Sequence, residues 1–182
     1  MIVRLPHPLE LARRIGAKVF DSPYSGNLIV IRGPGSPDMW DGLLTLSFKT
    51  REDGWITRSW PAATRPGTPF LTDPINPRGT GMMAAGVQNR GSHSRGSHKG
   101  RPALVQVGKM VVQRDNDKDM ILEPGAPEVN EGGGFNIHDI ARPSDLAGCC
   151  GLARIHMTEF LTVVESLEPH QGKVFSLSVV EG

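Results

Sequence analysis

Residues 27–50 read NLIVIRGPGSPDMWDGLLTLSFKT, and this stretch decides the fold class. Two short runs, NLIVIRG at 27–33 and GLLTLSFKT at 42–50, are apolar or alternate apolar with polar residues, and turn formers separate them. Apolar runs of this length between clusters of Gly, Pro and Asp are typical of strands joined by turns. With 22 Gly, 15 Pro and 5% aromatic residues, the chain suits many short strands better than long helices.

Strand patterns of the same kind continue along the chain from this pair. They lie at 54–60 (GWITRSW), 103–115 (ALVQVGKMVVQRD, two strands or one strand bent at Gly108), 132–140 (GGGFNIHDI) and 173–181 (KVFSLSVVE). Residues 61–89 are rich in Pro and Gly and predict an ordered loop with short strands. Residues 90–102, RGSHSRGSHKGRP, predict a mobile surface loop.

Two segments have helical spacing. Residues 9–16 predict a short helix that stops at Gly16. The better helix lies within the segment 157–170, with Thr158 as its cap and Pro169 beyond its end. Its apolar residues, three or four apart, are Met157, Phe160, Leu161, Val164 and Leu167. We therefore predict a mainly β protein of the α+β class with one C-terminal amphipathic helix.

Length and charge limit the classes of partner. The 182 residues suit a single domain, 1–182. Lys and Arg number 20 against 19 Asp and Glu, so the net charge predicts no nucleic-acid partner. The first 18 residues lack the apolar core of a signal peptide, and no stretch approaches the roughly 20 apolar residues that cross a bilayer. We expect a soluble chain made in the cytoplasm, with no signal peptide and no membrane span.

The chain has two cysteines, Cys149 and Cys150, which follow His138 in the stretch FNIHDIARPSDLAGCC at 135–150. A cysteine nucleophile needs a nearby imidazole to take its proton, and the intervening loop is long enough to bring the two together. Three interpretations remain open. Cys149 is a nucleophile with His138 as its base, or both cysteines are buried and inert, as is common for this residue type, or they form a strained disulfide.

The residues around Cys149 favour the first interpretation. Alternation along the predicted strand places Asn136 and His138 on the face away from the core. Gly148 permits close approach of an acyl substrate, and the main-chain N–H groups at Gly148 and Cys149 can stabilise an oxyanion. Because neighbouring side chains diverge, Cys150 is expected to be a packed thiol.

Four motifs in order, GSHKGRPALVQ at 96–106, VVQRDNDKD at 111–119, GFNIHDI at 134–140 and AGC at 147–149, resemble phage and prophage-associated relatives of the L,D-transpeptidases. The resemblance covers residues 55–182, and 1–54 would supply an N-terminal helix and strands. It implies a β-sandwich and a cysteine enzyme of peptidoglycan metabolism that needs no cofactor. The expected partner is a peptidoglycan stem peptide, attacked by transpeptidation or by hydrolysis, in phage lysis or from a virion.

Carried over residue by residue, the resemblance makes Cys149 the nucleophile, His138 its base and Gly148 the oxyanion turn. The family has Ser-His before Gly-Cys, where this chain has Leu146 and Ala147, and an arginine where this chain has Gly151. We expect substrate contacts from five residues: His98, Lys99, Arg101, Asn136 and Ala147. The altered positions also leave open a non-catalytic wall-binding or virion structural module that retains the fold.

Other polar motifs are weaker. Asp115, Asp117 and Asp119 alternate as in a calcium loop, but the sixth position lacks Gly and the twelfth lacks Glu, so a charged turn is favoured over a calcium site. His93 and His98 have no acidic or thiol ligand at zinc-site spacing, so we expect no metal there.

Overall fold

The computed structural model describes residues 6–52 and 54–182. The first five residues of the segment searched for a signal, and Asp53 in the turn after residue 50, lie outside the described residues. The opening stretch forms the two predicted strands, β1 (Asn27–Arg32) and β2 (Gly42–Lys49), which pair antiparallel. β2 pairs in turn with β3 (Trp55–Ala63), so the predicted succession of strands is confirmed here.

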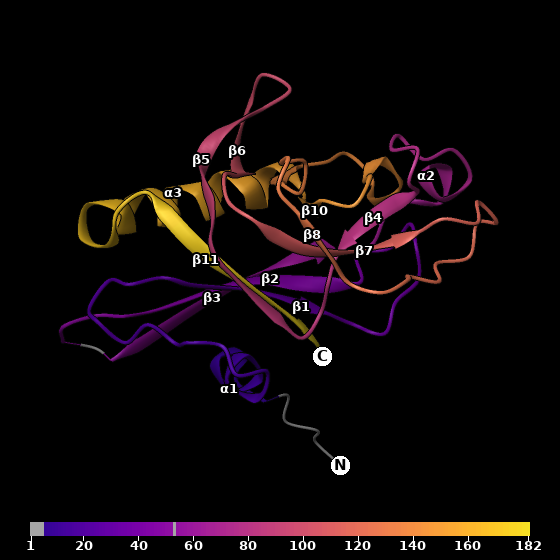
Figure 1. Ribbon diagram of the computed structural model, residues 1–182. Coiled ribbons are helices and arrows are strands. Elements are labelled where there is room, and N and C mark those ends of the chain that lie inside the picture. Colours follow the sequence, from indigo (N-terminus) through magenta and orange to yellow (C-terminus); the bar gives the residue numbers. More distant parts are fainter. Residues whose placement is uncertain (1–5, 53) are drawn as a thin grey trace, which may run out of the picture.

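Eight strands close into a barrel (Figure 1). The others are β5 (Val87–His98), β6 (Arg101–Gln106), β9 (Ile137–Asp139), β10 (Cys150–Leu152) and β11 (Val174–Glu181), in the order β1-β11-β5-β6-β9-β10-β3-β2. The mainly β class is confirmed. Strand pairing runs around a ring instead of dividing into the two open sheets of the expected β-sandwich, because the short strands β9 and β10 join β6 to β3.

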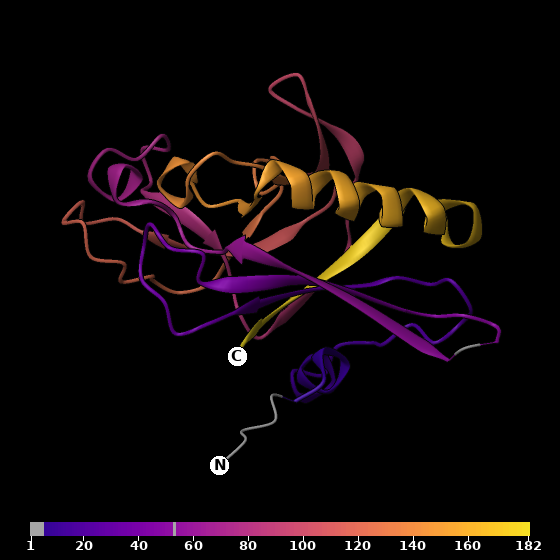
Figure 2. The same cartoon turned by 180° about the vertical axis from the view of Figure 1, so that it is seen from behind.

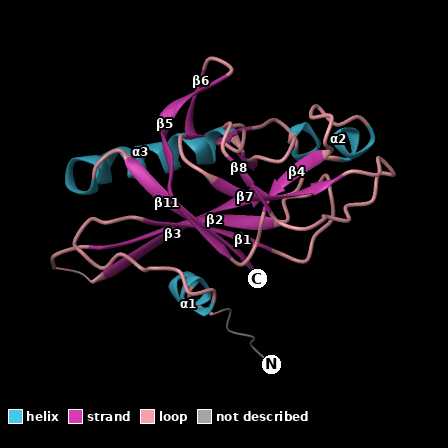
Figure 3. Ribbon diagram, viewed as in Figure 1, coloured by secondary structure: helices cyan, strands magenta, loops and turns pink. Residues whose placement is uncertain are grey.

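A second, three-stranded sheet lies beside the barrel (Figure 3). It consists of β4 (Thr80–Met83), β7 (Met110–Asp115) and β8 (Glu128–Asn130), all antiparallel. Residues 103–115 are therefore two strands, β6 and β7, in different sheets. The segment 61–89 contains β4 as a short strand, but also a helix that was not predicted, α2 (Thr68–Thr72).

The prediction of a mobile loop at 90–102 is wrong. Strands β5 and β6 run through it as a hairpin that projects from the body of the molecule (Figure 1). Its two-residue turn, Lys99 and Gly100, has φ of 49° and 79°, the left-handed backbone that tight hairpin turns need. The Gly and Ser residues give this strand no apolar alternation in the sequence. Pairing with β11 on one side and with β6 on the other holds β5 in place.

Helices lie on opposite sides of the strands (Figure 2). The long helix α3 (Arg154–Gln171) packs Met157, Phe160, Val164 and Leu167 into the main apolar core, where Phe160 meets Trp60 edge to face. α1 (Pro8–Arg14) packs Leu9 and Ala12 against Ile29 of β1. Alternate residues of β1 thus face the barrel core and α1, as a strand covered on both faces requires.

The predicted ends of the C-terminal helix need correction. Helix α3 begins four residues before Thr158, whose hydroxyl donates to the Arg154 carbonyl instead of capping the helix. Pro169 lies inside the last turn, where its missing N–H costs a single hydrogen bond, and the helix continues to Gln171 with Gly172 as its C-cap. In the described part of the chain, no helix is long and apolar enough to cross a membrane.

Candidate active site

The pairing of β9 with β10 determines which way each cysteine points. The strands are parallel, with Cys150 beside Ile137 and Gly151 beside His138. Paired residues share a face of a sheet, so Cys150 and Ile137 turn into the core, where both are fully buried. By the same alternation Cys149 lies on the face of His138.

The Cys149 sulfur is held by backbone groups. Its thiol donates to the Gly134 carbonyl at 3.1 Å, and the Asn136 N–H donates to the sulfur at 3.4 Å. The residue is 7% exposed, and burial raises the pKa of the Cys149 thiol against the opposing effects of the Asn136 N–H and Lys99. Among the described residues, none of the hydrogen bonds of this sulfur goes to His138. The resting group is a neutral thiol.

His138 is oriented by its neighbour in the chain. Its Nδ1 lies 2.9 Å from the backbone oxygen of Asp139. A carbonyl oxygen can only accept, so Nδ1 carries the proton and Nε2 of the neutral ring is a hydrogen-bond acceptor. Burial lowers the pKa of His138, while the Asp139 carbonyl and carboxylate act in the opposite direction. The ring is therefore neutral near pH 7 and has the tautomer of a general base.

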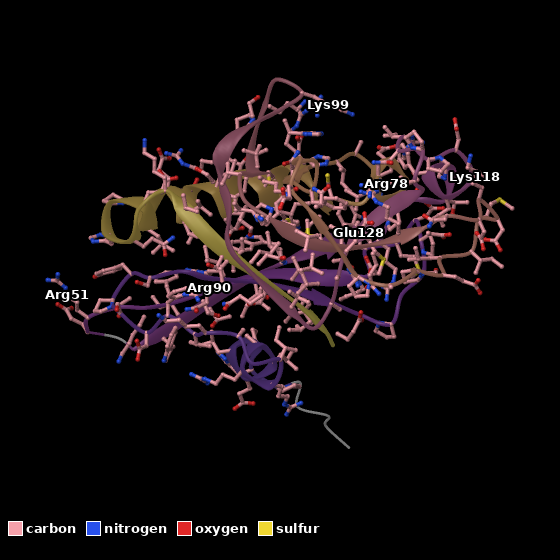
Figure 4. All side chains as sticks on the ribbon, viewed as in Figure 1. Arg51, Arg78, Arg90, Lys99, Lys118 and Glu128 are labelled. Atoms are coloured by element: carbon pink, nitrogen blue, oxygen red, sulfur yellow. The ribbon has the colours of Figure 1, made fainter. Side chains whose placement is uncertain are left out.

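Cys149 and His138 line the same cavity of about 300 Å3. It also brings together three of the five predicted substrate residues: His98, Lys99 and Ala147. Asn136 is buried and does not line the cavity, but its side-chain amide hydrogen-bonds the His98 ring at 2.9 Å. Arg101 lines an adjoining pocket with His98, Lys99 and His138, and its guanidinium pairs with Asp139 at 3.0 Å. Lys99 stands at the outer end of the hairpin (Figure 4).

Gly148 has a backbone conformation that residues with a side chain rarely adopt. Its φ is 109°, and a side chain there would overlap the Gly81 carbonyl of β4. This close approach of two backbones fixes the turn that carries Cys149. Within the described residues the Cys149 N–H makes no hydrogen bond, so it remains available to an anionic oxygen.

Gly151, which stands where the resemblance leads us to expect an arginine, is also tightly packed. A side chain there would collide with Ile140 and crowd Leu146. An arginine at this position would therefore require both residues to move. The packing around β10 therefore leaves no room for an arginine side chain at this position.

Arg114 of β7, which the sequence did not single out, also lines the cavity. The side chain is nearly buried; its Nε–H donates to Glu128 at 2.7 Å and its Nη1 to the Gly79 carbonyl at 3.2 Å. Glu128 also pairs with Arg78 (Figure 4). The alternation along VVQRD did not indicate that Arg114 lines the cavity, because this part of the cavity wall depends on the pairing of β4 with β7.

The acidic loop after β7 forms turns. Asp117 and Asp119 accept the backbone N–H groups of Asp119 and Ile121, and Asp115 is buried at the strand end. Among residues 6–52 and 54–182, no three His, Cys, Asp or Glu side chains cluster in a way that could hold a metal ion. His93 is buried between the Ser92 hydroxyl and the Phe135 carbonyl, each at 2.9 Å, so its ring serves the strand framework.

Comparison of the chain with protein-family models, with curated proteins and with solved structures found no match.

Proposed function

We propose that this protein is a cysteine enzyme of the L,D-transpeptidase type, with a variant of that family's fold, which acts on peptidoglycan stem peptides. One observation carries the proposal: Cys149 and His138 lie on one face of the β9–β10 pair and line one cavity. The tautomer of His138 suits a base, and the close contact of Gly148 with Gly81 fixes the turn that carries Cys149.

The proposed reaction starts from the neutral pair. The Cys149 side chain leaves the Gly134 carbonyl, and its sulfur attacks the peptide carbonyl while its proton moves to Nε2 of His138. The Cys149 N–H stabilises the oxyanion. Collapse of the adduct forms a thioester and breaks the peptide bond, and the leaving amine takes the proton back from His138. An amine or water, deprotonated by His138, then attacks the thioester and restores the thiol.

Two basic side chains, Lys99 and Arg114, line the cavity together with one acid, Asp145. Arg114 is also paired with Glu128, so the lining has little net charge, and we propose Lys99 and the Arg114 guanidinium as the individual contacts for the carboxylates of a stem peptide. We assign substrate contacts to His98, Lys99, Arg101, Asn136 and Ala147, and add Arg114 to them. We also propose that the protein acts on the cell wall during phage lysis or from a virion.

The test compares the two cysteines on purified sacculi. Cys149→Ala should fold and release no new muropeptides, whereas Cys150→Ala, at a core position, should retain activity despite a stability loss of about 1–2 kcal/mol. Mass spectrometry of the muropeptides reports both the bond broken and the acceptor. Digestion by Cys149→Ala at the parent rate would rule out the proposed mechanism.

A second candidate is a non-catalytic wall-binding or virion structural module. The observation in its favour is the resting state of Cys149. Its sulfur forms hydrogen bonds to backbone groups, and burial raises the pKa of its thiol. A parent protein that sediments with sacculi but yields no new muropeptide mass, with Cys149→Ala binding equally well, would support the module and exclude the enzyme.

A further inference from the structure

The side chain of Asn136 is fixed in one orientation. The backbone N–H of Gln106 donates to its Oδ1 at 2.9 Å, so its amide nitrogen faces Nδ1 of His98, also at 2.9 Å. An amide nitrogen only donates, and Nδ1 of His98 must therefore accept. The neutral His98 ring carries its proton on Nε2.

This ring lies on the proposed base. The imidazoles of His98 and His138 stack with centroids 4.2 Å apart and planes inclined by 26°. His138 is itself held by the hydrogen bond from its Nδ1 to the Asp139 carbonyl. Both rings are thus fixed by hydrogen bonds to Nδ1, one as acceptor and one as donor. A neutral aromatic face stabilises a cation stacked on it, whereas two stacked imidazolium ions repel.

The charged surroundings of His98 oppose its protonation. The titratable and charged groups that share its two pockets come from the hairpin, β7, β9, the 3-10 turn Pro143–Asp145 and the loop before β10: Lys99, Arg101, Arg114, His138, Asp139, Asp145 and Cys149. The carboxylate of Asp139 is already paired with Arg101 at 3.0 Å and with Arg154 of α3 at 3.3 Å. Burial, His138 and Lys99 lower the pKa of His98, and only Asp139 raises it.

We propose that His98 is a positioning residue for the reaction proposed above: Asn136 holds it neutral, its ring stabilises the imidazolium that forms when His138 takes the Cys149 proton, and its own protonation at acid pH stops the reaction. The inference rests on the proposed function. The proton passes from the Cys149 sulfur to His138 and returns to the leaving amine, and His98 takes no part in the transfer.

Asn136→Asp is the decisive variant. The carboxylate can still accept from the Gln106 N–H and leaves the Asn136 backbone contact with Cys149 in place, but it cannot donate to His98. Nitrogen-15 NMR of the full chain should show the His98 proton on Nε2 in the parent and on Nδ1 in Asn136→Asp. The proton affinity of His98 should rise about tenfold or more beside the new charge.

Asn130→Asp is the matched control. Asn130 lines the same cavity, and its amide bonds to Gln106 and Gly133, not to His98. Asn130→Asp adds the same negative charge but does not touch the hydrogen bond between Asn136 and His98, so the His98 tautomer should stay unchanged. A parent His98 that already carries its proton on Nδ1, or the same response to both variants, would overturn the assigned orientation of Asn136.

Kinetics on soluble muropeptides test the effect on the reaction. As pH is lowered, kcat/KM should start to fall about one pH unit higher in Asn136→Asp than in the parent. His98→Phe, which keeps a ring over His138, should retain kcat within about threefold, whereas His98→Ala should lose about tenfold or more. Equal kcat in the Phe and Ala variants would overturn the role of His98 alone. A parent without turnover would instead defeat the proposed function, while NMR would still report the His98 tautomer.

Discussion

The Cys149 thiol donates its hydrogen bond to the Gly134 carbonyl at 3.1 Å instead of to the imidazole of His138. The carbonyl belongs to a run of three glycines that precedes β9, and Gly133 and Gly134 both have positive φ. The resting sulfur is therefore protonated and directed at the backbone. The thiol must release the Gly134 carbonyl before its proton can pass to His138.

This arrangement predicts the pH dependence of alkylation. Cys149 should react slowly with iodoacetamide at pH 7 and faster as pH rises past the ordinary thiol value of 9.0, because burial raises its pKa. Cys150, fully buried in the core, should label only after unfolding. Mass spectrometry after timed labelling separates the two. A rate for Cys149 that is already maximal at pH 7 would indicate a thiolate–imidazolium pair and contradict the neutral resting state.

Gly148→Ala should destabilise the fold more than an ordinary glycine substitution. A methyl group there would overlap the Gly81 carbonyl in addition to straining a φ of 109°, so we expect a loss of about 3 kcal/mol or more in unfolding free energy. Gly133→Ala is the control, since its φ is 77° but nothing lies within 4 Å of an added Cβ; it should lose about 1–2 kcal/mol. Urea denaturation measures both, and equal losses would contradict the contact between Gly148 and Gly81.

His93 should make the fold sensitive to acid. Burial lowers its pKa from 6.5 to about 4, so the unfolded chain binds more protons between these values. Stability is then lost as pH falls from about 6.5 and the loss is complete below about 4, at about 3 kcal/mol from this residue. His93→Gln, which can still donate to the Phe135 carbonyl, should remove that part of the slope in denaturation curves between pH 7 and 4. An unchanged slope would show that other groups cause the acid loss.

Local periodicity was enough to predict most strands, but not the hairpin. The runs at 27–50 and 173–181 carry enough apolar residues to identify strands without their partners. In β5, Gly91, Gly96 and three serines hide the pattern, and only pairing with β6 and β11 makes it a strand. That error also concealed how His98 is fixed, since a mobile loop cannot hold a ring against His138.

The candidate site divides in the same way. Cys149 and His138 could be singled out because they lie close in sequence and in a motif. Arg114 could not, since it reaches the cavity only through the pairing of β4 with β7. The closed ring was also out of reach of the sequence, because it depends on strands β9 and β10, each of three residues, which are too short to have a period of their own.

The last prediction concerns Arg114 and rests on the proposed function. Its guanidinium lines the cavity of Cys149, and a hydrogen bond to a charged partner contributes about 1.5–3 kcal/mol, so Arg114→Gln should raise KM for muropeptides about tenfold or more and leave kcat nearly unchanged. Arg78→Gln is the control, because Arg78 pairs with the same Glu128 but lines a different pocket; its KM should match that of the parent. Circular dichroism of both variants checks that the loss of a Glu128 partner has not unfolded the small sheet.

If both variants raise KM equally, the effect comes from Glu128 and the stability of β8, and Arg114 does not bind the substrate. If only Arg114→Gln does so, Arg114 contacts the substrate, which places a carboxylate of the peptide beside β7 in the cavity of Cys149.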